Sequence, residues 1–314
     1  MSSSSGHDRN TVLGNSNRGR TMIASDLDRT LIYSAAALQL PVPVVDRTVA
    51  DQTVTDQTVT NQTVTDQTVT EPNLLCVELL DGKPQSFMTL DAALGLAAVA
   101  GRASFMPTTT RTMVQYLRVR FPGVAPEYAI TSNGGNILVD GRPDENWRRA
   151  TASVVSSCDA TVSDVRQELE RRSSNEWVLN CRVADDLFCY LVVDLPRMPD
   201  DFLESWSQWC EERGWWVSIQ GRKIYSIPRP LTKERAMFAV ADRLGIEQIF
   251  AAGDGALDCG FLAAATAGMR PPHGELDALD WQHPTVRVGP RAGVLAADDI
   301  VAWFTEQVST HAAA

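Results

Sequence analysis

The chain has 314 residues, of which 44% are hydrophobic, so it is long enough for about two domains and a sizeable buried core. Its 28 Lys and Arg residues against 39 Asp and Glu residues give a formal net charge of -11, which disfavours non-specific binding to nucleic acid or to a membrane surface. A metal cation is an easier partner for such a chain.

The six cysteines are scattered, without a Cys-x-x-Cys pair, and we expect reduced thiols. No segment is long and apolar enough to span a bilayer, and the first 20 residues contain no apolar stretch that could serve as a signal sequence. We therefore expect a cytoplasmic protein with a disordered leader over residues 1–20.

A short apolar run over residues 21–24 predicts a buried strand, and two carboxylates follow it directly, Asp26 and Asp28. A strand that ends in Asp-x-Asp projects both side chains to one side, at the carboxyl edge of a sheet. Taken alone, such a pair is more often a turn cap than a catalyst. The later motifs of the chain therefore decide between the two interpretations.

A tandem pentapeptide array of the type Asp-Gln-Thr-Val-Thr occupies residues 46–70. A period of five fits neither strand alternation nor helical turns, and one Val per unit cannot build a core. The array therefore predicts disorder or an irregular exposed loop. A short β-solenoid or an adhesive arm is the alternative.

The next part of the chain alternates between strands and helices. Two extended runs, residues 74–80 and 85–89, flank Asp81-Gly82 and predict a hairpin near the site. The elements predicted after it are a helix over 90–100 that ends at Gly101, a strand over 103–106, a helix over 112–121 and a strand over 128–130. Strand, polar turn and helix recur, which predicts a parallel sheet with crossover helices.

Between residues 141 and 225 the pattern changes to strand pairs joined by short turns, which are antiparallel. The predicted elements are a helix over 152–172, strands over 177–182 and 187–194, a helix over 200–213, and strands over 215–219 and 223–227. We interpret residues 141–225 as a separate α+β unit inserted into the parallel domain. Its tryptophans are expected in the core and on the sheet face.

The parallel pattern then returns. The remaining predicted elements are a helix over 232–244, a strand over 248–252, a turn that leads into an Ala-rich helix ending at Ala267, a strand over 285–288 and a helix over 299–308. The predicted fold class is therefore α/β, with a doubly wound, Rossmann-like parallel-sheet core over residues 21–140 and 226–310 and an inserted α+β cap.

Four groups of polar residues follow strands or open helices of the predicted sheet, where their side chains converge on one crevice. They are Asp26 with Asp28, then Thr109, then Lys233, then Asp254 with Asp258. This order resembles the haloacid dehalogenase superfamily of phosphatases, over roughly residues 21–310. The inserted unit resembles the larger, C2-type cap of the Cof-type and sucrose-phosphatase-like branch. The motifs at 26–34, 107–112 and 272–276 resemble phosphatases encoded with bacterial tellurium-resistance genes.

The resemblance implies a chemistry that suits these residue types. Asp26 would be the nucleophile that forms an aspartyl-phosphate, and Asp28 would protonate the leaving alcohol and then activate water. Thr109 would hydrogen-bond a phosphoryl oxygen, and Lys233 would offset negative charge. An anionic ester repels a carboxylate unless a cation intervenes, so Mg²⁺ is implied. Its ligands would be Asp26, the Asp28 carbonyl, Asp254 and Asp258, the last through water unless it orients Lys233 instead.

Further residues could line the phosphate or sugar side of the pocket, namely Arg29, Thr110, Arg111, Ser132 and Asn133. Alternatives stay open here: Thr108 or Thr110 could take the place of Thr109, Asn133 belongs to a good turn sequence, and Lys233 could be an ordinary residue of a first helical turn. His273 could touch the substrate or be solvated.

Two positions depart from the pattern of the resembled proteins. Arg29 stands where a glycine is usual and adds a bulky cation at the phosphate entrance. Leu257 replaces an Asn that is often found before the last acidic residue, which removes a polar group near the metal.

The sequence therefore predicts a Mg²⁺-dependent phosphatase of a small phosphorylated metabolite, with sugar phosphates as the favoured class and the inserted unit as a lid. One alternative is phosphoryl transfer within one sugar, as in phosphomannomutases. Another is a non-catalytic, phosphometabolite-binding stress-response protein, with the pentapeptide array as a tether. The substrate and the oligomeric state cannot be read from the sequence.

Overall fold

The computed structural model describes residues 20–38 and 72–312. The predictions for the leader and for the pentapeptide array lie outside these residues. Among the helices of the described part, none combines the length and the apolar character needed to cross a bilayer.

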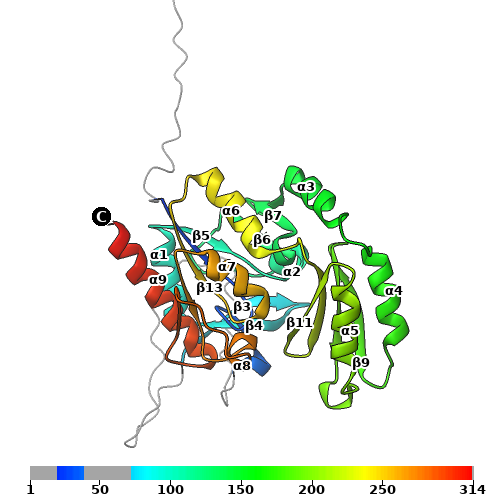
Figure 1. Ribbon diagram of the computed structural model, residues 1–314. Coiled ribbons are helices and arrows are strands. Elements are labelled where there is room, and N and C mark those ends of the chain that lie inside the picture. Colours follow the sequence, from blue (N-terminus) through cyan, green and yellow to red (C-terminus); the bar gives the residue numbers. More distant parts are fainter. Residues whose placement is uncertain (1–19, 39–71, 313–314) are drawn as a thin grey trace, which may run out of the picture.

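A five-stranded parallel sheet forms the centre of the molecule (Figure 1), in the order β15-β14-β13-β1-β5. Its strands are β1 (Thr21–Ser25), β5 (Ser104–Pro107), β13 (Gln248–Ala252), β14 (Ala267–Arg270) and β15 (Val286–Val288). Successive side chains of β1 enter different hydrophobic clusters, with Ile23 on one face and Met22 and Ala24 on the other. Both faces are buried, as expected for a parallel sheet.

Helices cover both faces of this sheet (Figure 1). The cluster on the Ile23 face includes α1 (Leu90–Ala100) and α9 (Ala296–Ala312), and the cluster on the opposite face includes α6 (Lys233–Leu244) and α7 (Cys259–Ala264). The helices α1 and α9 pack closely, because a Cβ on Gly95 would lie 2.7 Å from a Val301 methyl carbon. The predicted α/β, doubly wound fold class is confirmed.

The hairpin predicted before α1 is present as β3 (Leu74–Leu80) and β4 (Lys83–Thr89), with β2 (Tyr33–Ser34) on the free side of β4. Its turn uses positive φ angles at Asp81 and Gly82, as the turn sequence predicts. The helix predicted over 112–121 is wrong in length, because α2 covers only Met113–Tyr116. Beyond it the chain pairs with β3 instead: the backbone N–H of Arg120 donates to the Val77 carbonyl at 2.8 Å.

A small antiparallel sheet follows, in the order β6-β7-β8. Its strands are β6 (Tyr128–Thr131), β7 (Asn136–Val139) and β8 (Arg142–Pro143), of which only β6 was predicted. Strand β6 continues the parallel arrangement past β5, since the backbone N–H of Thr109 donates to the Ile130 carbonyl at 2.9 Å. The loop after β5 is thereby held between β1 and β6.

The helix predicted over 152–172 is two helices, α3 (Glu145–Val155) and α4 (Val162–Arg172). The break occurs because Thr161 caps a new helix through a reciprocal capping box with Asp164. Trp147 of α3 packs in the same cluster as α6 and donates from its indole nitrogen to the Gly134 carbonyl at 2.9 Å. Helix α3 thus rests on the parallel-sheet core.

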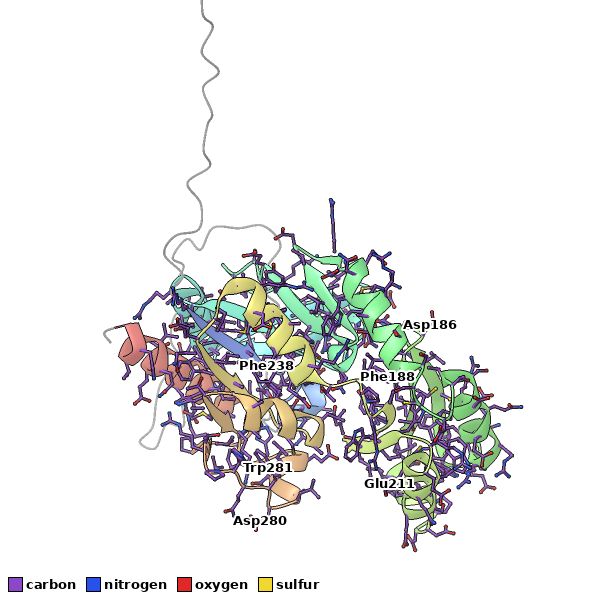
Figure 2. The ribbon with its side chains drawn as sticks, turned by 45° about the horizontal axis from the view of Figure 1, so that its top comes forward. Asp186, Phe188, Glu211, Phe238, Asp280 and Trp281 are labelled. Carbon is purple, nitrogen blue, oxygen red and sulfur yellow. The ribbon has the colours of Figure 1, made fainter. Side chains whose placement is uncertain are left out.

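The chain beyond α3 forms an α+β unit with its own hydrophobic cluster, which includes the buried Trp177, Trp206 and Trp215. From here on we call residues 160–228 the inserted unit, in place of the predicted bounds 141–225, because α3 packs on the parallel-sheet core. Its antiparallel sheet has the order β11-β12-β10-β9. The elements are α4, β9 (Val178–Ala184), β10 (Phe188–Val193), α5 (Phe202–Glu211), β11 (Trp215–Gln220) and β12 (Lys223–Pro228). In Figure 2, Asp186, Phe188 and Glu211 mark this unit, whereas Phe238, Asp280 and Trp281 lie on the parallel-sheet core.

The C-terminal part differs from the prediction in one strand. The helix predicted to reach Ala267 ends at Ala264, and β14 follows it, a short strand whose Gly and Arg content hid it from pattern reasoning. The short helix α8 (Glu275–Ala278) comes next. Single-turn 3-10 helices complete the secondary structure at Ala35–Ala37, Ser132–Gly134, Leu195–Arg197, Ala256–Asp258 and Gly293–Leu295.

Candidate active site

The loops after β1, β5 and β13 are joined at the carboxyl edge of the sheet. The backbone N–H of Asp26 donates to the Ala252 carbonyl at 2.8 Å, and that of Thr108 donates to the Ser25 carbonyl at 2.8 Å. The polar residues that follow these three strands are therefore neighbours in space. This is the crevice in which open α/β sheets bind ligands.

Lys233 is a completely buried cation at the start of α6. Its ammonium lies 2.6 Å from Asp26 Oδ1 and 2.5 Å from Asp258 Oδ1. Burial of an unpaired ammonium would be very unfavourable, so these two carboxylates are what make this position possible. Lys233 is thus not an ordinary solvated residue of a first helical turn.

The start of α6 is fixed by the turn after β6. Gly134 has a φ of +91°, and a Cβ there would lie 2.0 Å from the Thr232 carbonyl oxygen, so only glycine permits this approach. The Asn133 amide donates to the Leu231 carbonyl at 2.7 Å. Asn133, predicted to bind substrate, is buried here and positions the helix that carries Lys233.

Asp258 shapes the loop after β13. Its Oδ2 accepts hydrogen bonds from the backbone N–H groups of Asp254 and Gly255, at 3.0 and 2.8 Å, while its Oδ1 faces Lys233. The carboxylate therefore holds the loop that presents Asp254 and also orients Lys233.

Three buried carboxylates, Asp26, Asp254 and Asp258, place oxygen atoms within 4.8 Å of one another. Burial raises the pKa of Asp26 to about 7, against the pull of the Lys233 charge and with the repulsion of Asp258 adding to the rise. Burial, followed by repulsion from Asp26, raises the pKa of Asp254 as well. The Thr30 hydroxyl lies between them, 3.5 Å from Asp26 Oδ2 and 3.4 Å from Asp254 Oδ1.

The charge balance of this cluster fits a divalent cation. Lys233 offsets one of the three negative charges, and the Arg29 guanidinium approaches Asp254 only to 3.8 Å from a half-exposed position. A hard cation with a preference for carboxylate oxygens, such as Mg²⁺, would compensate the remaining charge. The donor set present in the chain therefore suits the ion that the sequence implies.

Asp28 is held by Arg111 in a two-pronged ion pair. Arg111 Nε and Nη2 donate to the two Asp28 carboxylate oxygens, both at 2.7 Å, and Nη1 donates to buried Glu78 at 2.8 Å. Burial raises the pKa of Asp28, but the charge and hydrogen bonds of Arg111 outweigh it and leave that pKa below its ordinary value. Arg111, predicted to bind substrate, is engaged here with these carboxylates and with the Ser86 hydroxyl.

The three threonines after β5 have hydroxyl groups with different partners. The Thr108 hydroxyl donates back to the Met106 carbonyl at 3.3 Å. Thr109 is fully buried, and its hydroxyl oxygen accepts from the backbone N–H of Arg111 at 3.2 Å. Thr110 interacts with the Tyr225 hydroxyl of β12. The Thr108 hydroxyl is thus bonded to its own strand, and Thr109 and Thr110 remain the candidates for a phosphate contact.

Two carboxylates that sequence reasoning did not select connect the inserted unit to the core. Asp185, between β9 and β10, accepts from the Ser132 hydroxyl and from the backbone N–H of Met113 at 3.0 Å. Glu275 accepts from the Ser218 hydroxyl at 3.0 Å and from the backbone N–H of Ala256 at 2.9 Å. Ser132, predicted to bind substrate, is thus engaged with Asp185. The positive φ angle at Asp185 is a signal of a tight turn that the Asp-Asp sequence could have suggested.

The conformation at Arg29 accounts for the usual glycine at this position. Arg29 has a φ of 65°, in the left-handed region that favours glycine. Its carbonyl accepts from the Tyr33 hydroxyl at 2.8 Å and from His273 Nε2 at 2.8 Å. The backbone N–H of Gly293 donates to His273 Nδ1 at 3.1 Å, which assigns the ring proton to Nε2, and burial lowers the His273 pKa. His273 therefore supports the Arg29 backbone in its neutral form.

Leu257 also has a structural role, since it packs against the hydrophobic cluster of the inserted unit. Where the resembled proteins often carry Asn, this chain has an apolar contact between the loop after β13 and the inserted unit. The sequence alone predicts only the loss of a polar group at this position.

Comparison with solved structures supports the architecture. The sucrose-phosphatase of Synechocystis, solved with sucrose and phosphate, is 15% identical with a TM-score of 0.57, over 91% of this chain and 98% of that one. A Thermoplasma acidophilum protein is 14% identical with a TM-score of 0.51, over 70% and 90% of the two chains. A HAD subclass IIB sugar phosphatase is 10% identical with a TM-score of 0.50, over 70% and 92%.

The chain has a haloacid dehalogenase-type fold. No protein-family model and no curated protein sequence matches it. At these identities the comparison establishes the architecture, and the roles of individual residues are argued from their geometry.

Proposed function

We propose that the protein is a Mg²⁺-dependent phosphatase that hydrolyses a small phosphorylated metabolite through an aspartyl-phosphate on Asp26. The observation that carries the proposal is the buried Asp26–Lys233–Asp258 arrangement beside Asp254, at the carboxyl edge of a parallel sheet. An ion pair with only a structural role would not require Asp254, a third buried carboxylate that is repelled by Asp26 and Asp258. Buried like charges with raised pKa values are typical of functional sites.

Asp26 is oriented for attack by the groups around it. Lys233 holds Oδ1, which leaves Oδ2, beside the Thr30 hydroxyl, as the attacking oxygen. The Asp26–phosphorus bond forms as the ester P–O bond breaks, and Asp28 gives its proton to the departing alcohol. Asp28 then takes a proton from water, which attacks phosphorus and releases inorganic phosphate from Asp26.

Thr109, Thr110 and Arg29 would bind phosphoryl oxygens. Asp26, Asp254 and Asp258, with the Asp28 carbonyl, would hold Mg²⁺, which would supply charge compensation between the carboxylates and the phosphate. Asp28 can carry a proton only when it has lost part of its contact with Arg111, because that contact favours the ionised form. Arg111 therefore acts as a positioning residue that holds Asp28 until the substrate binds.

The inserted unit would act as a lid over this site. Its contacts with the core through Asp185 and Glu275 are polar, so they can break and re-form as the substrate enters and leaves. The structural neighbours with a sugar phosphatase activity in their names favour a sugar phosphate as substrate. Closure would exclude water until the aspartyl-phosphate has formed.

Phosphoryl transfer within one sugar, as in phosphomannomutases, is the second candidate, because the same groups serve both reactions until water attacks. A non-catalytic role in phosphometabolite binding is the third, motivated by Arg29 and Leu257. The link to tellurium-resistance genes and the cytoplasmic location remain predictions from the sequence.

A phosphate-release screen over a panel of phosphorylated metabolites, with Mg²⁺ and with EDTA, tests the proposal. We expect Mg²⁺-dependent release by the wild type and none by Asp26→Asn. Asp81→Asn is the matched control, since Asp81 is an exposed turn residue with positive φ, which Asn also tolerates. Release of an isomerised ester instead of phosphate would favour the mutase. Tight ligand binding without turnover would favour the non-catalytic role.

A further inference from the structure

The hairpin β11–β12 of the inserted unit contacts the loop after β13 and the start of α8. Ser218 and Ile219 of β11 donate to Glu275, and a Cβ on Gly255 would lie 2.7 Å from the Gln220 amide nitrogen. Leu257 packs against the same unit. Residues of this hairpin that point toward the core therefore face the space into which the leaving group of a bound ester would extend.

Lys223 opens β12 and is a cation in this space. It is paired in register with Val192 of β10, and its ammonium lies 5.8 Å from the centre of the Tyr190 ring. It interacts with the Tyr225 hydroxyl, which in turn interacts with Thr110 of the core, and its charge acts on Asp28. The rings of Tyr190 and Tyr225 are buried, with their centroids 5.4 Å apart and their planes inclined at 36°.

The positive charge of Lys223 has no carboxylate of its own. Within residues 20–38 and 72–312, no carboxylate oxygen forms an ion pair with this ammonium. Asp28 is its nearest acidic neighbour by charge interaction, but both Asp28 oxygens already accept from Arg111. Lys223 is partly buried, and a cation partly withdrawn from water is stabilised by a carboxylate partner, so a partner that arrives with the substrate is physically reasonable.

The chemistry of the position indicates which partner fits. On the core side, Lys233, Arg29 and the metal ligands would compensate the charge of the transferred phosphate. Lys223 is therefore available to bind the other end of the ester. One ammonium beside the Tyr225 hydroxyl and over the Tyr190 ring suits a carboxylate, which carries one charge and accepts several hydrogen bonds. A second phosphate carries up to two charges and is matched less well by the single ammonium of Lys223, because the neighbouring Arg222 is exposed at the hairpin turn.

We infer that Lys223, with Tyr225 and Tyr190, binds a carboxylate on the leaving group, so that the preferred substrates are phosphate monoesters of hydroxy acids. This inference rests on the proposed phosphatase function and narrows its substrate class. Sugar acids and short hydroxy acids both meet the description, and their lengths differ.

Two matched pairs of esters test the inference with the full-length protein and Mg²⁺. One pair is 3-phosphoglycerate and glycerol 3-phosphate, and the other is 6-phosphogluconate and sorbitol 6-phosphate. In each pair a carboxylate replaces a CH₂OH group. We expect kcat/KM to be at least about tenfold higher for the acid in at least one pair, which also reports the reach of Lys223.

The variants separate a specific contact from a general charge effect. Lys223→Met should bring the ratio within each pair to about one or below, Lys223→Arg should retain most of the preference, and Lys83→Met, at an exposed lysine that begins β4, should leave the ratio unchanged. An equal kcat/KM for acid and alcohol in the wild type would overturn the inference, as would a preference that survives in Lys223→Met. Absence of phosphate release from every ester would instead contradict the proposed function itself.

Discussion

Asp26 is predicted to destabilise the metal-free protein, and its replacement by Asn should stabilise it. Burial raises the pKa of this carboxyl to about 7 from an ordinary 3.8. A shift of that size corresponds to roughly 4 kcal/mol of lost unfolding free energy once the group is ionised. The Asp26→Asn variant would lose a charged hydrogen bond to Lys233, whose other partner Asp258 remains, so we expect a net gain of about 1–3 kcal/mol.

The pH dependence has a defined sign. Because the folded-state pKa is raised, the folded protein holds this proton more tightly than the unfolded chain, and stability is lost as pH rises from the unfolded pKa through the folded one. As pH rises from about 5.5 to about 8, the wild type should lose roughly 2 kcal/mol of unfolding free energy through the ionisation of this carboxyl. The Asp26→Asn variant should not show this loss.

Urea unfolding in EDTA at these two pH values measures the effect, with Asp81→Asn as control. Saturating Mg²⁺ should reverse the order, because the wild type gains binding free energy, roughly 2.7 kcal/mol at a hundred times the Kd, and the variant gains less. A variant that is less stable than the wild type in EDTA at the higher pH would refute the reasoning. The carboxylate would then be favourably solvated, and the charge balance argued for a cation would fail.

Three further perturbations test other parts of the site. Gly134→Ala should lower the unfolding free energy by more than about 3 kcal/mol, since its Cβ overlaps a carbonyl oxygen, whereas Gly221→Ala, with positive φ but open space, should lose only about 1 kcal/mol in urea unfolding. Arg111→Met should destabilise by about 2–4 kcal/mol and should raise the pKa of Asp28, so the basic limb of the pH profile of kcat/KM, where the proton donor is lost, should move to higher pH; an unmoved limb would contradict the positioning role. Asp185→Ala should increase amide hydrogen exchange in β9 and β10 and leave that of β1 unchanged. Exchange in β9 and β10 at the wild-type rate would show that Asp185 does not hold the inserted unit.

The sequence was sufficient for the elements with strong local patterns. The buried strand before Asp26, the hairpin around Asp81-Gly82 and the glycine-terminated helix α1 are all found where periodicity and turn chemistry predict them. The convergence of Asp26, Lys233 and Asp258 also followed from their places after strands and at a helix start. These features depend on interactions close in the chain or on a common topological rule.

The errors arose where tertiary contacts override local preference. The stretch after Tyr116 has helical residues, but Val119 and Phe121 are buried, and the backbone at Val119 and Arg120 pairs with β3. The split between α3 and α4 depends on a cap at Thr161. The contacts of Asp185, Lys223 and Glu275 join segments distant in sequence, so no spacing could have revealed them.

The proposed function requires that Asp26 becomes phosphorylated during turnover. Acid-quenched turnover of a radiolabelled phosphate ester that the protein cleaves measures this directly, as label bound to the denatured protein. We predict a bound label for the wild type, a larger amount for Asp28→Asn, in which water is no longer activated, and none for Asp26→Asn. Phosphate release by Asp26→Asn at the rate of the wild type, or turnover with no label on the wild type or on Asp28→Asn, would contradict the account.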